Sequence, residues 1–216
     1  DGCTIASNNE LEWYLPDNVF LRDGKLVLQA REEAVTAPDG RHFDYTSGMI
    51  STGSLEYLGP VLREFEHVYV EMRAKVPAGK GLWPAFWLLP SSRESRPEID
   101  VMEILGHEPD VLHMHYHYST RRGRLQSVGS EWQAEAPLTD WHVYAVDWQP
   151  FALTWYLDGE KLYHFHDTDE RGFISDEPMY LLANLAVGGD WPGAPDEHTV
   201  FPAEFEIDYI RVWVRN

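Results

Sequence analysis

Three carboxylate residues stand within six positions of one another near the middle of the chain. Glu98, Asp100 and Glu103 occur in the segment Pro97–Gly106, whose other residues are mostly apolar. Because side chains alternate between the faces of a strand, Glu98 and Asp100 would share one face and Glu103 would point into the core. A buried, unpaired carboxylate is costly, so we expect a β-bulge at Val101–Met102 that returns Glu103 to the face of the other two acids.

Three carboxylates on one face repel one another, and such an arrangement persists where it has a use. Glycosidases place two carboxyl groups beside the bond they cleave, and a separation of about 5–5.5 Å is typical of the retaining class. On a straight strand the Cα atoms of Glu98 and Glu103 would be roughly 13 Å apart, so their side chains must lean together on a concave sheet. The competing interpretation is an edge strand whose acids face the solvent.

The aromatic residues upstream favour the first interpretation. Trp83, Ala85 and Trp87 share a face by the same period of two, and the chain contains 9 Trp and 11 Tyr. Flat apolar rings beside carboxylates are typical of a groove that stacks on sugar rings, although an aromatic core accounts for many of these residues. The pattern predicts a carbohydrate-cleaving site on one face of a sheet.

The charge of the chain restricts its partners. It has 36 acidic and 17 basic residues, for a net charge of −19. Such a surface repels nucleic acid, anionic lipid and sulfated polymers, so we expect a neutral polysaccharide partner, or a charge that serves solubility alone. No apolar run is long enough to cross a membrane and no signal-peptide pattern is present. We expect the mature form of a secreted, monomeric protein, in which the single residue Cys3 forms no internal disulfide.

Strand and turn signals predict one all-β domain over residues 1–216. Asp23-Gly24 and Asp158-Gly159 each separate two alternating segments, which is a strong hairpin signal. Strands are expected over residues 25–31, 68–76, 141–148, 153–157, 161–165, 179–186 and 205–214. No window sustains helical periodicity, and only a short helical turn is expected at Thr168–Phe173. These elements predict an antiparallel β-jelly-roll sandwich with a concave cleft.

The chain resembles glycoside hydrolase family 16 over nearly its whole length. The signature Glu98–Glu103 is the most specific similarity, and the others are Asn8–Leu11, Tyr45–Gly48, Trp83–Pro90, Asn184–Gly193 and Asp208–Trp213. The resemblance implies a jelly roll with an open cleft. The extra residue at the expected bulge is similar to the laminarinase, agarase and carrageenase branch of this family.

The resemblance also implies roles for individual residues. Glu98 would be the nucleophile of a retaining mechanism, Asp100 the assisting carboxylate and Glu103 the acid/base. His117 is expected close to the acid/base, and further sugar contacts are expected from Trp83, Trp87, Trp191, Asn9 and Asn184. The family often carries a structural calcium that uses the position of Asp208 together with an N-terminal strand. Only seven residues precede Asn8, so that strand is expected to be missing or to be supplied otherwise.

His113, His115 and His117 alternate along one predicted strand and therefore share a face. Imidazole is a common zinc ligand, but residues two apart on a strand are separated by about 6.6–6.8 Å, so only neighbours in this series could share an ion. We therefore expect His117 to orient the acid/base and His113 and His115 to contact sugar. No cofactor is expected to take part in catalysis.

The expected function is endo-acting hydrolysis of β-1,3-linked glucan of the laminarin type, with retention of configuration. Mixed-linkage β-glucan, agar and other β-galactans remain open as substrates of the same mechanism. A non-catalytic glycan-binding jelly roll is the alternative from another class, and it predicts the loss of one of the two glutamates. A metal-dependent jelly-roll enzyme is the third alternative.

Overall fold

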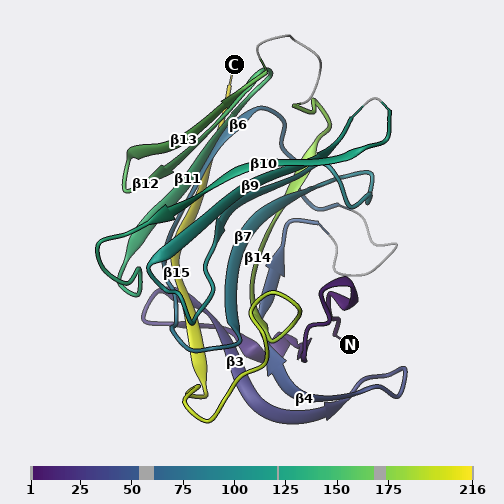
Figure 1. The fold of residues 1–216 in the computed structure, drawn as a ribbon. Coiled ribbons are helices and arrows are strands. Elements are labelled where there is room, and N and C mark those ends of the chain that lie inside the picture. Colours follow the sequence, from purple (N-terminus) through teal and green to yellow (C-terminus); the bar gives the residue numbers. More distant parts are fainter. Residues whose placement is uncertain (1, 54–60, 121, 168–173, 216) are drawn as a thin grey trace.

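Two β-sheets pack face to face in the computed structural model, which describes residues 2–53, 61–120, 122–167 and 174–215 (Figure 1). The larger sheet has nine strands, in the order β1 (Glu12–Tyr14), β4 (His42–Ser47), β3 (Lys25–Thr36), β15 (Ala203–Val214), β6 (Val68–Lys75), β11 (His142–Gln149), β12 (Ala152–Leu157) and β13 (Glu160–His166), with β2 (Val19–Arg22) paired to β3. The smaller sheet has six strands, in the order β10 (Leu125–Gln133), β9 (Val111–Ser119), β8 (Glu98–Glu103), β7 (Leu82–Pro90), β14 (Met179–Val187) and β5 (Met49–Ser51).

Neighbouring strands run antiparallel except at the pair β1–β4, which is parallel. Two short 3-10 helices, η1 (Ala6–Asn8) and η2 (Pro16–Asn18), flank β1. The all-β jelly-roll sandwich expected from the strand signals is therefore confirmed. No helix in the described part of the chain is long and apolar enough to span a membrane.

The two predicted Asp-Gly hairpins are present. Asp23 and Gly24 have φ values of 51° and 75°, and Asp158 and Gly159 have 50° and 83°. Positive φ at both central residues matches the right-handed twist of the flanking strands, and it closes the two-residue connections β2–β3 and β12–β13. The β2–β3 pairing continues in register, whereas the β12–β13 pairing shifts between Trp155 and Tyr156. The strand expected at residues 25–31 continues to Thr36. The expected helical turn at Thr168–Phe173 lies outside the described residues.

The core lies between the sheets and follows from strand alternation. In β6 every second residue is buried, from Val68 to Ala74. Strand β14 is buried along its whole length, and Trp148 and Trp155 are the largest of the fully buried side chains. Each large apolar side chain that is fully buried contributes roughly 1.5–3 kcal/mol, so this layer fixes the sheet on which the carboxylates stand.

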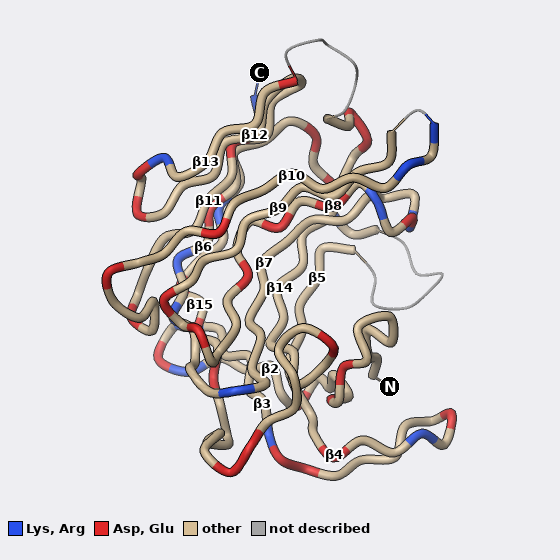
Figure 2. Tube along the Cα trace, in the orientation of Figure 1, with Lys and Arg blue, Asp and Glu red and all other residues tan. Residues whose placement is uncertain are grey.

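Charged residues are distributed unevenly between the two sheets (Figure 2). Strands β5, β7, β9 and β14 of the smaller sheet contain no Asp, Glu, Lys or Arg, and β10 contains only Glu131. Strand β8 lies among them with three acids in six residues. The acids of β8 are therefore isolated in an otherwise almost uncharged sheet.

Candidate active site

The β-bulge predicted in the carboxylate strand is present. In the pairing of β8 with β7, Met102 lies opposite Phe86 and Asp100 lies opposite Trp87, which leaves Val101 as the extra residue. The pairing of β8 with β9 shifts register at the same place. The interruption leaves the backbone carbonyl of Asp100 available to Trp155, whose Nε1 donates a hydrogen bond to it at 2.9 Å across the core.

The bulge brings the three carboxylates to one cavity of about 440 Å³, a size typical of ligand sites. This cavity, which we call the cleft, lies on the face of the smaller sheet that points away from the larger sheet. Its lining includes Asn8, Glu10, Trp83, Trp87, Glu98, Asp100, Glu103, His115, His117, Asn184 and Trp191. No lysine or arginine is among the described residues that line the cleft.

Glu98 and Asp100 are joined by a hydrogen bond between their side chains. Burial, followed by the charge of Glu103, raises the pKa of Glu98 to about 7. The same causes, with Glu98 added, raise the pKa of Asp100 well above its ordinary value. Asp100 is therefore the protonated member of the pair, and its carboxyl group donates a hydrogen bond to Glu98, an arrangement that two close acids favour.

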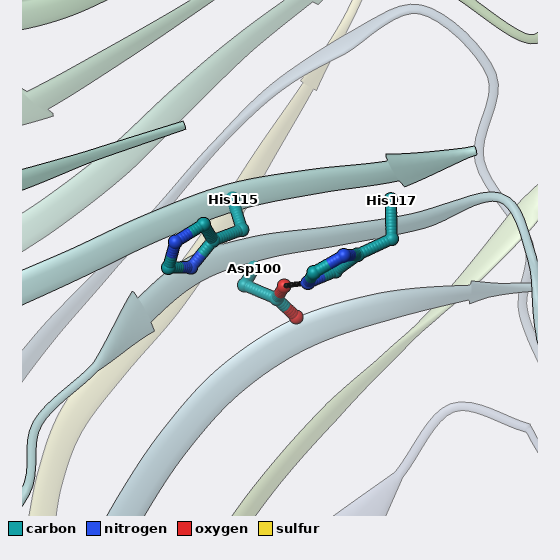
Figure 3. A group of neighbouring side chains, drawn as sticks. All are labelled: Asp100, His115 and His117. Carbon is teal, nitrogen blue, oxygen red and sulfur yellow. Dashed lines mark ion pairs between the residues drawn. The ribbon is translucent and has the colours of Figure 1, made fainter. Parts of the chain in front are cut away.

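Each histidine at the cleft lies beside a different acid, and Figure 3 shows His117 next to Asp100. His115 Nδ1 is 3.5 Å from Glu103 Oε2, whereas His117 Nε2 is 3.2 Å from Asp100 Oδ2 and 4.0 Å from Glu98 Oε1. Burial lowers the pKa of His117 to about 4, so its ring is neutral near pH 7. His117 was expected beside Glu103, but the structure brings the side chain of His115 to that carboxylate and places His117 beside Asp100 and Glu98.

His113 does not line the cleft, in contrast to the expectation that it contacts sugar. It is 4% exposed, and the ring of Trp191 covers it edge-on at 4.8 Å. No hydrogen bond reaches either ring nitrogen, and burial lowers the pKa of the ring, which keeps it neutral. It shares a strand face with His115, but the loop after β14 separates it from the cavity.

The tryptophans expected at the cleft are held by polar contacts. Trp83 Nε1 donates to Glu103 Oε1 at 3.2 Å, and Trp87 Nε1 donates to Asn184 Oδ1 at 2.8 Å. Trp191 is 41% exposed and meets Trp83 edge-to-face at 5.3 Å. Exposed aromatic faces beside carboxylates form a surface on which a sugar ring can stack.

The N-terminal segment supplies cleft residues that differ from the prediction. Asn8 and Glu10 line the cleft, whereas Asn9 donates to both carboxylate oxygens of Asp190 at 3.1 Å. Asn9 therefore fixes the loop that carries Trp191. Glu10 accepts hydrogen bonds from Asn8 Nδ2 at 2.9 Å and from the hydroxyl of a buried tyrosine at 3.1 Å.

Glu12, the first residue of β1, was not predicted as part of the site. It is fully buried, and its Oε2 accepts a hydrogen bond from the backbone N–H of Val187 at 2.8 Å. Burial and the neighbouring Glu10 raise its pKa well above the ordinary value. The sequence signal was the acidic alternation Glu10-x-Glu12 in a segment that is otherwise apolar or neutral.

The surroundings of Asp208 do not fit a calcium site. Its Oδ1 lies 2.7 Å from Lys25 Nζ and its Oδ2 lies 2.6 Å from Arg73 Nη1. Two cationic side chains thus neutralise the carboxylate that a calcium ion would need, and they lower the pKa of Asp208. The expectation of a calcium ligand at this position is corrected on that ground.

Known proteins share both the sequence pattern and the fold. The model of glycosyl hydrolases family 16 matches residues 8–211. A β-glucanase of Rhodothermus marinus is 32% identical over 95% of this chain and 74% of its own length. A glucan endo-1,3-β-glucosidase A1 of Niallia circulans is 33% identical over 95% of this chain, which spans only 32% of that relative.

The fold comparison agrees. The laminarinase catalytic domain of Thermotoga maritima superposes with a TM-score of 0.85 and 34% identity, covering 98% of this chain and 86% of that one. Because the family model covers most of the chain and the carboxylate strand, cleft and fold all match it, the chain belongs to glycosyl hydrolases family 16.

Proposed function

We propose that this glycoside hydrolase cleaves β-1,3-linked glucan internally and retains the configuration of the anomeric carbon. The observation that carries the proposal is the bulged strand β8, which places Glu98, Asp100 and Glu103 together in an aromatic cleft. The names of the Niallia circulans relative and the Thermotoga maritima neighbour support the linkage. The name of the Niallia circulans relative also supports attack within the polymer.

In the proposed mechanism each carboxyl group has one task. Glu98 attacks the anomeric carbon while Glu103 protonates the departing oxygen, and Glu103 then deprotonates the water that releases the product. The hydrogen bond from Asp100 stabilises the carboxylate of Glu98 before attack. When the glycosyl-enzyme forms, the charge of Glu98 disappears, and the change favours Glu103 as a base for the second step.

Charge supports a neutral substrate. The net charge of −19 and the absence of Lys and Arg from the described cleft lining would repel sulfate or uronate groups. We further propose that the protein acts outside the cell, because a polymeric glucan does not enter cells intact. We also propose that it acts as a monomer, since a single chain supplies the carboxylates and aromatic rings of the cleft.

A substrate panel tests the specificity. Release of reducing ends should be fastest on laminarin, slower on lichenan, and negligible on agarose and κ-carrageenan. Faster cleavage of agarose would contradict the glucan proposal, and binding without cleavage of any polymer would favour the non-catalytic alternative.

Stereochemistry tests the mechanism separately. Proton NMR of the first products should show the β-anomer, which then mutarotates. An α-anomer that appears first would require a wider carboxyl pair with a water between them and would exclude the double displacement by Glu98.

A further inference from the structure

Two histidines and an aspartate converge in the cleft beside the reacting carboxylates (Figure 3). One ring nitrogen each of His115 and His117 and one carboxylate oxygen of Asp100 all lie within 4.8 Å of one another. The two histidines project from the same face of β9, and Asp100 is paired with His115 across the ladder. We propose that these three side chains bind one divalent transition-metal ion, of which Zn²⁺ fits best, and that the bound ion blocks hydrolysis.

The surroundings of Asp100 favour a cation. Its side chain is 3% exposed, yet no hydrogen bond reaches Oδ2. His117 Nε2 lies 3.2 Å from this oxygen but is out of line for a donated hydrogen bond. A buried carboxylate oxygen without a donor is costly, and an ion bound by both atoms would remove that cost. Glu98 and Glu103 nearby add negative potential, which the charge of Arg96, just before the strand, offsets only in part.

The spacing of the ligand atoms fits zinc. Zn–N bonds of about 2.0–2.1 Å and Zn–O bonds of about 2.0–2.2 Å place tetrahedral ligand atoms about 3.3 Å apart. Asp100 Oδ2 and His117 Nε2 already have nearly this separation, at 3.2 Å. The side chain of His115 is 24% exposed, and a shift of its ring by roughly 1.5 Å would complete the set. Imidazole with carboxylate favours Zn²⁺ over Mg²⁺ or Ca²⁺.

A second His-x-His pair lies outside the cleft and can be compared with the pair His115 and His117. His164 and His166 on β13 have the same spacing, and their rings stack 6.2 Å apart. Among the described residues, only the cleft pair is joined by a third ligand group into a possible metal site. The β13 pair therefore provides a matched control within the same protein.

A metal ion at this position would stop the chemistry by occupying its carboxylates. Asp100 would release its proton to the solvent on binding the ion, and its hydrogen bond to Glu98 would be lost. Glu98 Oε1 lies 4.0 Å from His117 Nε2, close enough to become the fourth ligand, and a coordinated carboxylate cannot attack the anomeric carbon. This inhibitory part rests on the proposed glucan hydrolysis, whereas metal binding itself does not.

Titration of the untagged protein tests both parts. Zn²⁺ binding is measured by calorimetry, and Co²⁺ serves as a probe whose visible absorption reports tetrahedral coordination. We expect one ion per chain, and His115→Ala and His117→Ala should each weaken binding by at least about 10–100-fold, the range already seen when outer-shell partners are lost. His166→Ala should leave the affinity unchanged. Turnover of laminarin should fall in proportion to Zn²⁺ occupancy and return when EDTA is added.

Each alternative result would contradict either the metal site or the proposed inhibition. Unchanged affinity in folded His115→Ala and His117→Ala, checked by circular dichroism, would place the ion elsewhere. Should those variants fail to fold, Asp100→Asn tests the same site. Binding that leaves turnover unaffected, or turnover lost with EDTA and restored by Zn²⁺, would overturn inhibition. Metal binding at this site in a protein that cleaves no glucan would refute the proposed function and leave the metal site supported.

Discussion

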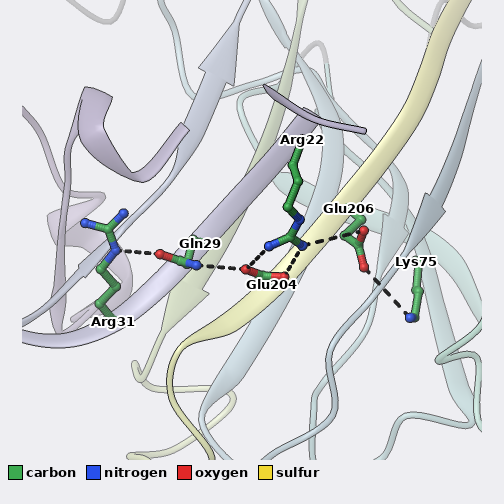
Figure 4. A network of polar contacts seen from close by, with 6 residues as sticks. All are labelled: Arg22, Gln29, Arg31, Lys75, Glu204 and Glu206. Carbon is green, nitrogen blue, oxygen red and sulfur yellow. Dashed lines mark hydrogen bonds and ion pairs between the residues drawn. The ribbon is translucent and has the colours of Figure 1, made fainter. Parts of the chain in front are cut away.

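The surroundings of acidic side chains on the two sheets shift their pKa values in opposite directions. On the larger sheet, Glu204 accepts hydrogen bonds from Arg22 and Gln29 within a row of alternating charges and amides that continues to Arg31, Glu206 and Lys75 (Figure 4). These donors lower the pKa of Glu204. On the smaller sheet, burial and Glu103 raise the pKa of Glu98 to about 7.

This difference shows where the fold keeps buried acids close together although they repel one another. The chain has basic residues available and uses them to neutralise exposed acids on the larger sheet. It leaves the acids of β8 without a single Lys or Arg on any strand of their own sheet. Arg96, just before β8, lowers the pKa of Glu98 and Asp100, but burial and the neighbouring acids outweigh it. Acids whose pKa stays raised, in a protein that pairs other acids with basic residues, indicate the site where charge is needed for chemistry.

The largest expected effect is at Glu103, on the acidic strand β8 of the smaller sheet. Glu103→Gln keeps the size of the side chain and an oxygen for Trp83 Nε1, but removes the proton that the leaving group needs. We expect kcat on laminarin to fall by about 10²–10⁴ with folding intact. Glu204→Gln, which removes a compensated acid, is the control and should leave kcat unchanged. Near-normal turnover in Glu103→Gln would remove it from the role of acid/base.

Glu12 provides the second test, because it is an uncompensated acid outside the catalytic strand. Its raised pKa means that the folded chain holds a proton that the unfolded chain loses above about pH 4.5, so its contribution to stability falls as pH rises. Glu12→Gln should keep the hydrogen bond from Val187 and raise the free energy of unfolding at pH 8 by about 1–3 kcal/mol. Denaturant unfolding at pH 4.5 and 8 measures this, and an equal effect at both pH values would contradict it.

A smaller effect is expected at the edge of the cleft, where Asn9 binds Asp190. Asn9→Ala releases the loop that carries Trp191, so we expect KM to rise by about two- to tenfold while kcat changes less. Steady-state kinetics on laminarin separate the two parameters. A fall in kcat with unchanged KM would show that the loop serves the chemical step instead of binding.

The smallest effect is expected at Glu204 on the larger sheet, where Arg22 pairs with the carboxylate. Glu204→Gln should lower the melting temperature by no more than about 2–4 °C, because exposed ion pairs contribute little. The difference from the wild type should shrink further in 1 M salt, which screens the remaining pairs. A large, salt-independent loss would mean that the network supports the sheet more strongly than its exposure suggests.

Local rules predicted the parts of this fold that depend on short stretches of chain. The Asp-Gly hairpins follow from the backbone angles of their turns, and the bulge at Val101 follows from the cost of burying Glu103. The resemblance assigned Asn9 to the cleft, but Asn9 adopts a left-handed conformation after η1, with φ of 54°, and its side chain binds Asp190. Its neighbour Asn8 lines the cleft instead.

The position of His113 depends on contacts that sequence spacing does not contain. It shares a face with His115 and His117, as alternation predicts, but the loop that carries Trp191 comes from a distant part of the chain and covers it. The same limit applies to which histidine stands beside which acid, because the bulge shifts the register between β8 and β9 by one residue.

The bulge also ties the length of the carboxylate segment to its conformation. Five steps separate Glu98 from Glu103, and this odd number returns Glu103 to the cleft face only because Val101 is an extra residue in the ladder. Deleting Val101 would make the number of steps even, so strict alternation alone would keep Glu103 on the cleft face and Met102 in the apolar layer, with Glu103 one strand step, about 3.3 Å, nearer to Glu98. A homologue that is one residue shorter between its two glutamates can therefore present the same acids on the same face, whereas a chain of this length needs the bulge to do so.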